Sequence, residues 1–126
     1  MHILLIEDNP DHVYFARRAI EETWGDATLD VARDLREVEA LMQRSAPQTH
    51  FDLLLAALDS RDNQRLMQLR ELQTCPEMQT APIIALVSST RDQELAQVAN
   101  QPLDWIILKP LRAEALQEAI QRRPLA

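Results

Sequence analysis

The stretch that decides the fold is Phe51-Asp52-Leu53-Leu54-Leu55-Ala56-Ala57-Leu58-Asp59. Its centre is a continuous apolar run, without the alternation of apolar and polar residues that marks a half-exposed strand. Such a run is typical of a strand buried on both faces of a parallel sheet. The carboxyl end of this predicted strand carries Ala57, whose side chain has no acid, base or nucleophile.

Segments on both sides of this stretch repeat the order of strand and then helix. Apolar strand-like runs cover residues 3–6, 83–87 and 105–108, and residues 28–32 form a short second predicted strand. Apolar residues at helical spacing follow each of these strands and the opening stretch, around residues 13–20, 35–42, 66–72, 95–99 and 115–120. Strands that alternate with helices predict a parallel sheet covered on both faces. Right-handed crossovers then favour an α/β fold, the flavodoxin-like three-layer αβα sandwich with five strands in the order 2-1-3-4-5.

Turn and cap residues mark the ends of the predicted helices. Asn9 is a good N-cap and Pro10 suits the first helical turn, so the first helix begins there. Asp34 is predicted to cap the second helix. Gly25 lies where a residue in the left-handed conformation would end the first helix, and Trp24 is predicted to fill the core beside it.

Composition restricts the class of protein. The chain has 126 residues, which fits one domain, 1–126, and we expect no attached output domain. A formal net charge of −7 argues against binding to nucleic acid or to an anionic membrane. One cysteine excludes an internal disulfide, and a single glycine excludes glycine-rich phosphate loops. The opening apolar run is too short for a signal peptide or membrane span, so we expect a cytoplasmic protein.

Polar residues follow several of the predicted strands at their carboxyl ends. Glu7 and Asp8 follow the first strand and Lys109 follows the fifth, while Val87 and Ser88 stand at the end of the fourth. In open parallel sheets, the functional crevice lies beyond these ends, at the switch in strand order. Two carboxylates and a lysine are therefore expected to face one pocket.

Motifs at these positions resemble the receiver domain of two-component response regulators, the CheY-like family, over essentially the whole chain. The matching segments are Ile3-Leu4-Leu5-Ile6-Glu7-Asp8-Asn9-Pro10, Asp52-Leu53-Leu54-Leu55, Pro82-Ile83-Ile84-Ala85-Leu86 and Lys109-Pro110. The resemblance implies a phosphorelay signalling module, not an enzyme, that receives a phosphoryl group from a kinase histidine on an aspartate. It implies that Glu7 and Asp8 are the acidic pair that binds Mg²⁺ and that Lys109 is the lysine that contacts the phosphoryl oxygens.

The same resemblance exposes four departures from the family's pattern. The acceptor aspartate is expected five residues after Asp52, where the chain has Ala57. The hydroxyl position falls on Val87, and the aromatic switch position falls on Ile106. The proline and glycine of the loop after the acceptor are replaced by Arg61 and Arg65. An engineered change of the acceptor would explain Ala57 alone, so the pattern indicates a degenerate receiver, or pseudo-receiver.

Two alternatives remain open for the acidic residues. Glu7 and Asp8 either keep weak Mg²⁺ binding or are neutralised by Lys109 without a metal, and the second reading is favoured. Asp59, or Asp8, is a substitute acceptor in the alternative function, although a solvated loop carboxylate is the simpler account of Asp59. No role is predicted for His2, His12 or His50, nor for Cys75. Ser88, Ser89 and Thr90 are read as helix caps.

The favoured function is a receiver-like module that acts by protein–protein interaction without phosphorylation at the usual position. Its expected partner is a histidine kinase, a phosphotransfer protein or a downstream signalling protein. A homodimer is possible through the helix around 95–99, the strand 105–108 and the last helix. Trp105 and Ile106 are the interface candidates, with packing beneath a helix as the alternative for Trp105.

Overall fold

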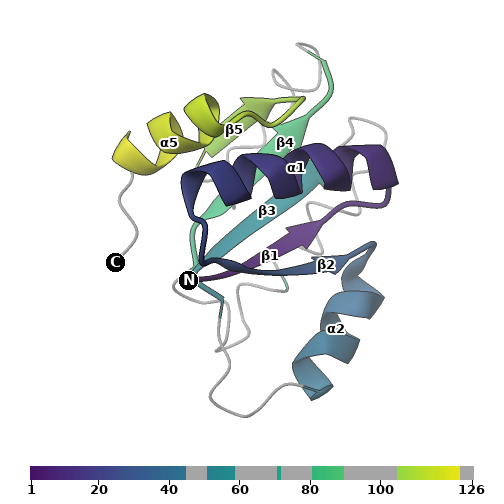
Figure 1. The fold of residues 1–126 in the computed structure, drawn as a ribbon. Coiled ribbons are helices and arrows are strands. Elements are labelled where there is room, and N and C mark those ends of the chain that lie inside the picture. The colour runs from purple at the N-terminus through teal and green to yellow at the C-terminus, as the bar shows by residue number, and fades with distance from the viewer. Residues whose placement is uncertain (45–50, 59–70, 72–80, 90–104, 123–126) are drawn as a thin grey trace.

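A five-stranded parallel sheet forms the centre of the molecule (Figure 1). The computed structural model describes residues 1–44, 51–58, 71, 81–89 and 105–122. The strands run in the order β2-β1-β3-β4-β5, which confirms the predicted topology. Their bounds are β1 His2–Ile6, β2 Thr28–Ala32, β3 Leu53–Leu58, β4 Ile83–Val87 and β5 Trp105–Leu108.

The three inner strands are buried on both faces, as their apolar runs predict. Residues 53–56 of β3 and all of β4 are buried, and β1 is buried from Ile3 onward. The backbone fixes how they align: Ile3 lies opposite Leu53, and Leu54 lies opposite Ile83. At the start of β1, the His2 N–H donates to the Asp52 carboxylate at 2.8 Å, and the Asp52 N–H donates to the His2 carbonyl at 2.7 Å.

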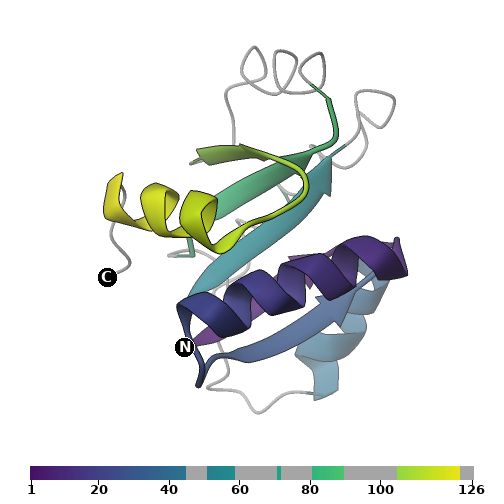
Figure 2. The ribbon, with the colours of Figure 1, turned by 45° about the horizontal axis from the view of Figure 1, so that its top comes forward.

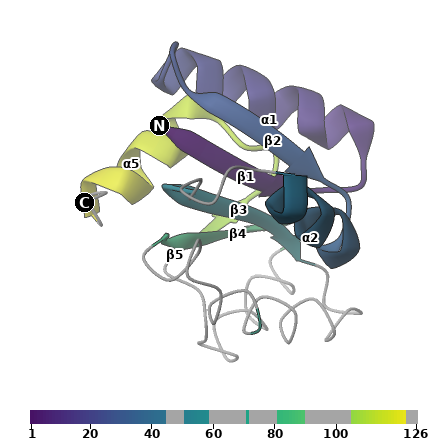
Figure 3. The ribbon, with the colours of Figure 1, turned by 90° about the horizontal axis from the view of Figure 1, so that it is seen from below.

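Helices cover the two faces of this sheet in separate layers. Helices α1, Pro10–Thr23, and α5, Ala113–Arg122, lie side by side on one face, and α2, Leu35–Arg44, lies on the other (Figures 2 and 3). Buried Ala16, Ile20 and Leu116 pack on the first face with the side chains of Leu5 and Leu86. Val38 of α2 belongs to the core on the opposite face. The predicted three-layer sandwich is therefore present.

Both predicted helix starts in the described part of the chain are confirmed. Asn9 is the N-cap of α1, and its side-chain oxygen accepts a hydrogen bond from the Asp11 N–H at 2.9 Å. Asp34 accepts from the Glu37 N–H at 3.0 Å at the start of α2. These bonds satisfy backbone donors that have no partner within the helix.

The prediction for Gly25 is wrong. Helix α1 ends at Thr23, Trp24 continues in an extended conformation, and Gly25 does not have a positive φ. The last turn closes when the Trp24 N–H donates to the Ile20 carbonyl at 2.7 Å. Trp24 leaves the helix in an extended conformation while its side chain packs against the core, so the helix ends without a left-handed residue.

Several predictions lie outside the described residues. They concern the helices around 66–72 and 95–99, the cap at Thr90, and Cys75, His50, Asp59, Arg61 and Arg65. Within the described ranges, no helix is long and apolar enough to cross a membrane.

Candidate functional site

The carboxyl ends of β1, β3, β4 and β5 meet at one edge of the sheet. Ile6 lies opposite Ala56, so the next residues of these strands, Glu7 and Ala57, extend the same alignment. Val87 lies opposite both Leu58 and Leu108. The backbone then places the polar residues: the Glu7 N–H donates to the Ala32 carbonyl at 2.9 Å, and the Lys109 N–H donates to the Val87 carbonyl at 2.7 Å.

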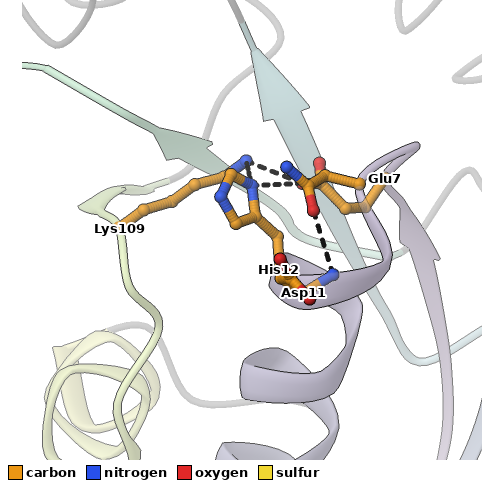
Figure 4. A network of polar contacts seen from close by, with 5 residues as sticks. Glu7, Asp11, His12 and Lys109 are labelled. Atoms are coloured by element: carbon orange, nitrogen blue, oxygen red, sulfur yellow. Dashed lines mark hydrogen bonds and ion pairs between the residues drawn. The ribbon is translucent and has the colours of Figure 1, made fainter.

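Glu7 and Lys109 form an ion pair at this edge (Figure 4). The Lys109 Nζ donates to the Glu7 Oε1 at 2.9 Å, although the two residues are far apart in sequence. The side chains are only 3% and 13% exposed for Glu7 and Lys109, respectively. A carboxylate removed from water to this degree requires a compensating charge, and Lys109 supplies it.

His12 joins the same pair from the first turn of α1. Its Nδ1 lies 2.7 Å from the Glu7 Oε1 and 3.0 Å from the Lys109 Nζ. A protonated Nδ1 donates to Glu7, whereas a bare Nδ1 accepts from Lys109, so the two contacts favour opposite tautomers. The sequence gives one usable signal for this role: His12 lies one turn into a helix that begins directly after Glu7 and Asp8.

Asp8 takes no part in the Glu7 network of the described chain. Its side chain is exposed, and no hydrogen bond or ion pair joins it to the rest of the described chain. The acidic pair therefore splits into one buried and one solvated carboxylate. Among the described residues, no three side chains of metal-ligating type gather together. Since one Glu7 oxygen is already held by Lys109 and His12, these side chains do not fit a closed Mg²⁺ site in this arrangement.

A pocket of about 370 Å³ opens beside the network, on the face that carries α1 and α5. Apolar side chains form most of its wall, and the polar residues Glu7, His12, Ser88 and Lys109 line it as well. The apolar residues are Leu5 from β1, Leu86 from β4, Phe15 and Ala16 from α1, and Pro110 and Leu111 from the segment before α5. It thus has the apolar lining and few polar groups that are usual for small-molecule sites.

Comparison with known proteins assigns the architecture. No protein-family model matches the chain. The probable methanogenesis regulatory protein FilR2 of Methanothrix harundinacea is 25% identical over 126 residues, covering 94% of this chain and 78% of that protein. The bacteriophytochrome response regulator AtBRR is 23% identical, with a TM-score of 0.81 over 99% of this chain and 93% of its own. The chain has the CheY-like receiver fold.

A second solved receiver domain has a similar fold. The receiver domain of the sensor histidine kinase PA1611 from Pseudomonas aeruginosa PAO1 is 21% identical, with a TM-score of 0.71 over 96% of this chain and 94% of its own. That structure holds a magnesium ion in its active site cleft.

The receiver fold also places the other residues singled out in the sequence. Ala57 is half-buried on β3 opposite Leu86, and Val87 is wholly buried at the end of β4. Ile106 is half-buried and packs against the core on the α2 face. Trp105 is half-buried and packs against the core on the α1 and α5 face, and its role in an interface stays a prediction. The structure brings Glu7 and Lys109 together, adds His12 and leaves Asp8 outside.

Proposed function

We propose that the chain is a receiver-like signalling module of a two-component phosphorelay that acts by protein–protein interaction, without phosphorylation at the usual position. The observation that carries the proposal is Ala57, half-buried on β3 at the edge where Glu7 and Lys109 meet. An alanine offers no oxygen to attack a phosphoryl donor and no ligand to Mg²⁺. The regulatory relative and the response-regulator structures described above support the signalling class.

The state of Lys109 supports the same proposal. In phosphoryl transfer, a cation assists by neutralising charge on the transferred group. Here the Lys109 ammonium already contacts the Glu7 carboxylate at 2.9 Å and His12 at 3.0 Å. A phosphoryl group at residue 57 would have to compete with a buried carboxylate for this ammonium. The contacts of Lys109 therefore support a module whose conformation is not switched by phosphorylation and is recognised by partners as it stands. This role requires no enzymatic activity of the chain itself.

Phosphorylation is tested by incubating the protein with acetyl phosphate and Mg²⁺ and measuring the intact mass. We expect no added phosphoryl group in the native chain and no change on addition of beryllofluoride. Ala57→Asn is the matched control for the geometry of residue 57, and Ala57→Asp is the positive comparison. An acid-stable, base-labile adduct on the native chain would contradict the proposal.

An unorthodox phosphoacceptor that uses Asp8 or Asp59 with Mg²⁺ is the second candidate. The observation in its favour is Asp8, which is exposed and has no partner within the described chain. If it operates, peptide mass spectrometry after acetyl phosphate treatment finds the adduct on one of these residues. Asp8→Asn and Asp59→Asn would then each be tested for its loss. Absence of any adduct eliminates this candidate.

We also propose that the chain forms a homodimer through the face that includes β5. Leu108 on the edge strand β5 is 42% exposed, whereas Trp105 is half-buried in the core. Leu108→Ser therefore removes exposed apolar surface without disturbing Trp105, which makes it a cleaner probe than Trp105→Ala. Sedimentation over a range of concentrations should show a dimer in the native protein and a monomer in Leu108→Ser. A native protein that stays monomeric at all concentrations would rule out the homodimer, so that the proposed partners would all be other proteins. The proposed setting for these interactions is the cytoplasm.

A further inference from the structure

We infer that the pocket beside Glu7 and His12 binds a small uncharged molecule with an apolar, ring-sized body and one hydroxyl group. Glu7 and Lys109 lie at the edge where the resemblance places a phosphoryl group, but the pocket extends from there along α1 and the segment before α5. The inference goes beyond the proposed function and stands independently of it.

The volume and lining of the pocket indicate the size and polarity of the ligand. A volume of 370 Å³, at about 30 Å³ for each water of liquid, corresponds to roughly a dozen non-hydrogen atoms. Leu5, Leu86 and Leu111 are 5% exposed or less, so they form a fixed inner wall. Phe15 is 49% exposed and also lines the pocket, so ligand binding would remove part of its ring from water. An apolar body therefore gains stabilisation by covering Phe15.

The Glu7 carboxylate sets the head group. Both contacts from His12 and Lys109 reach the same oxygen, Oε1. Within the described chain, no hydrogen bond reaches the other oxygen, Oε2, although the side chain is only 3% exposed. An almost fully buried carboxylate oxygen without a donor is costly. Since Glu7 lines the pocket, a ligand that donates an O–H to Oε2 would satisfy it.

The charges around the pocket favour a neutral ligand over an ion. Glu7 and Lys109 already neutralise one another at 2.9 Å. An added carboxylate would meet the Glu7 charge, and an added ammonium would meet the Lys109 charge, each after losing its own water. A hydroxyl avoids both penalties. The Ser88 hydroxyl, which has no partner within the described chain, can also donate to or accept from a hydroxyl group.

The test uses para-hydroxyacetophenone as the probe and isothermal titration calorimetry with amide NMR shifts as the measurement. We expect saturable binding, with the largest shifts at the residues that line the pocket. Its methyl ether keeps the ring but cannot donate, and it should bind about tenfold more weakly because the bond to a charged acceptor is lost. The anion para-methoxybenzoate, which differs from this ether by a carboxylate in place of the acetyl group, should bind more weakly than the ether.

Two neighbouring aromatic residues provide the matched variants. Phe15 lines the pocket, whereas Tyr14, 54% exposed on the same helix, does not. Phe15→Ala should weaken binding of the phenol several-fold, and Tyr14→Ala should leave it unchanged within twofold. Because both side chains are about half-exposed, neither variant threatens folding. Absence of saturable binding, equal affinity for the phenol and its methyl ether, or equal weakening by both variants would overturn the inference.

Discussion

The Glu7 carboxylate shows how much of the site follows from residue type and how much does not. Its pairing with Lys109 could be predicted, because parallel topology brings the residues after β1 and β5 to one edge. The place of His12 in the first helix, shortly after Glu7, brings it near this edge, but its contact with Glu7 depends on a rotamer that the sequence does not specify. The separation of Asp8 from Glu7 is also a matter of side-chain direction, which successive residues of a loop do not reveal.

The Glu7–Lys109 pair should be a large local contributor to stability. Lys109→Met leaves the Glu7 carboxylate buried with only His12 beside it, so we expect a loss of about 3 kcal/mol in the free energy of unfolding. The double variant Glu7→Gln with Lys109→Met should regain most of this loss, because no buried charge remains. Urea denaturation at neutral pH measures both. A loss below about 1 kcal/mol in the single variant would show that the pair is well hydrated.

Residue 57 should control metal binding. Ala57→Asp adds a third carboxylate to the edge where Glu7 and Asp8 stand, and repulsion between like charges should destabilise the metal-free protein. Saturating Mg²⁺ should then stabilise this variant by about 2 kcal/mol and leave the native chain almost unchanged. Thermal unfolding with and without Mg²⁺ checks this, with Ala57→Asn as the uncharged control. An equal response of all three proteins would contradict the expectation.

At the scale of the element, cap residues were the most reliable signals. Asn9 and Asp34 each begin a helix at the predicted residue because their side chains replace a missing backbone partner. The end of α1 was harder to predict, since Gly25 suits a left-handed turn, but Trp24 leaves the helix in an extended conformation and packs on the core. The packing of Trp24 on the core thus decided how α1 ends, rather than the tendency of Gly25 to adopt a left-handed conformation. The local sequence does not show which of these two effects is larger.

The cap of α1 should be worth about 1 kcal/mol. Asn9→Ala removes the acceptor of the 2.9 Å bond from the Asp11 N–H and should lower the free energy of unfolding by that amount. Asn9→Gly is the informative control, because glycine at the N-cap usually lowers the free energy of unfolding by only a few tenths of about 1 kcal/mol. Chemical denaturation of both variants checks the difference. Equal losses would indicate that the Asn9 side chain matters through another contact.

The start of α2 should give the stability a specific dependence on pH. Hydrogen bonds from the Arg33 N–H and guanidinium hold the pKa of Glu37 below its usual value of 4.5. A lowered folded-state pKa means that this contribution is fully present above about pH 4.5 and is lost as the pH falls through the lower folded-state value. Glu37→Gln should therefore flatten the acid side of the stability curve. Glu39→Gln, an exposed change on the same helix, should not alter it.

For the whole molecule, topology followed from the sequence because three strands are apolar without interruption. Such runs are stable only inside a sheet covered on both faces, and right-handed crossovers leave few orders for five of them. The pocket beside Glu7 cannot be predicted in this way. Its walls come from four segments that are separate in the sequence. A void forms where side chains from these segments leave space between them, so no single segment predicts it.

Hydrogen exchange should reveal the distribution of stability across the sheet. The amides of β1 and β3 are paired on both edges and surrounded by buried side chains, so they should exchange only through global unfolding. Amides of the edge strand β5, where Leu108 is exposed, should exchange at least about tenfold faster. Mass spectrometry or NMR measures these rates. Uniform protection of all five strands would show that the edge is covered in solution.

The half-buried place of Ala57, at the end of a strand whose stability lies in the residues before it, has an evolutionary consequence. Selection for folding acts strongly on residues 53–56 and only weakly on residue 57. Under the proposed function, a lineage with this scaffold can therefore exchange switched for constitutive signalling in a single substitution. The reverse step requires more than an aspartate at residue 57, because Val87 and Ile106 also depart from the receiver pattern, even though Glu7 and Lys109 are retained in their ion pair.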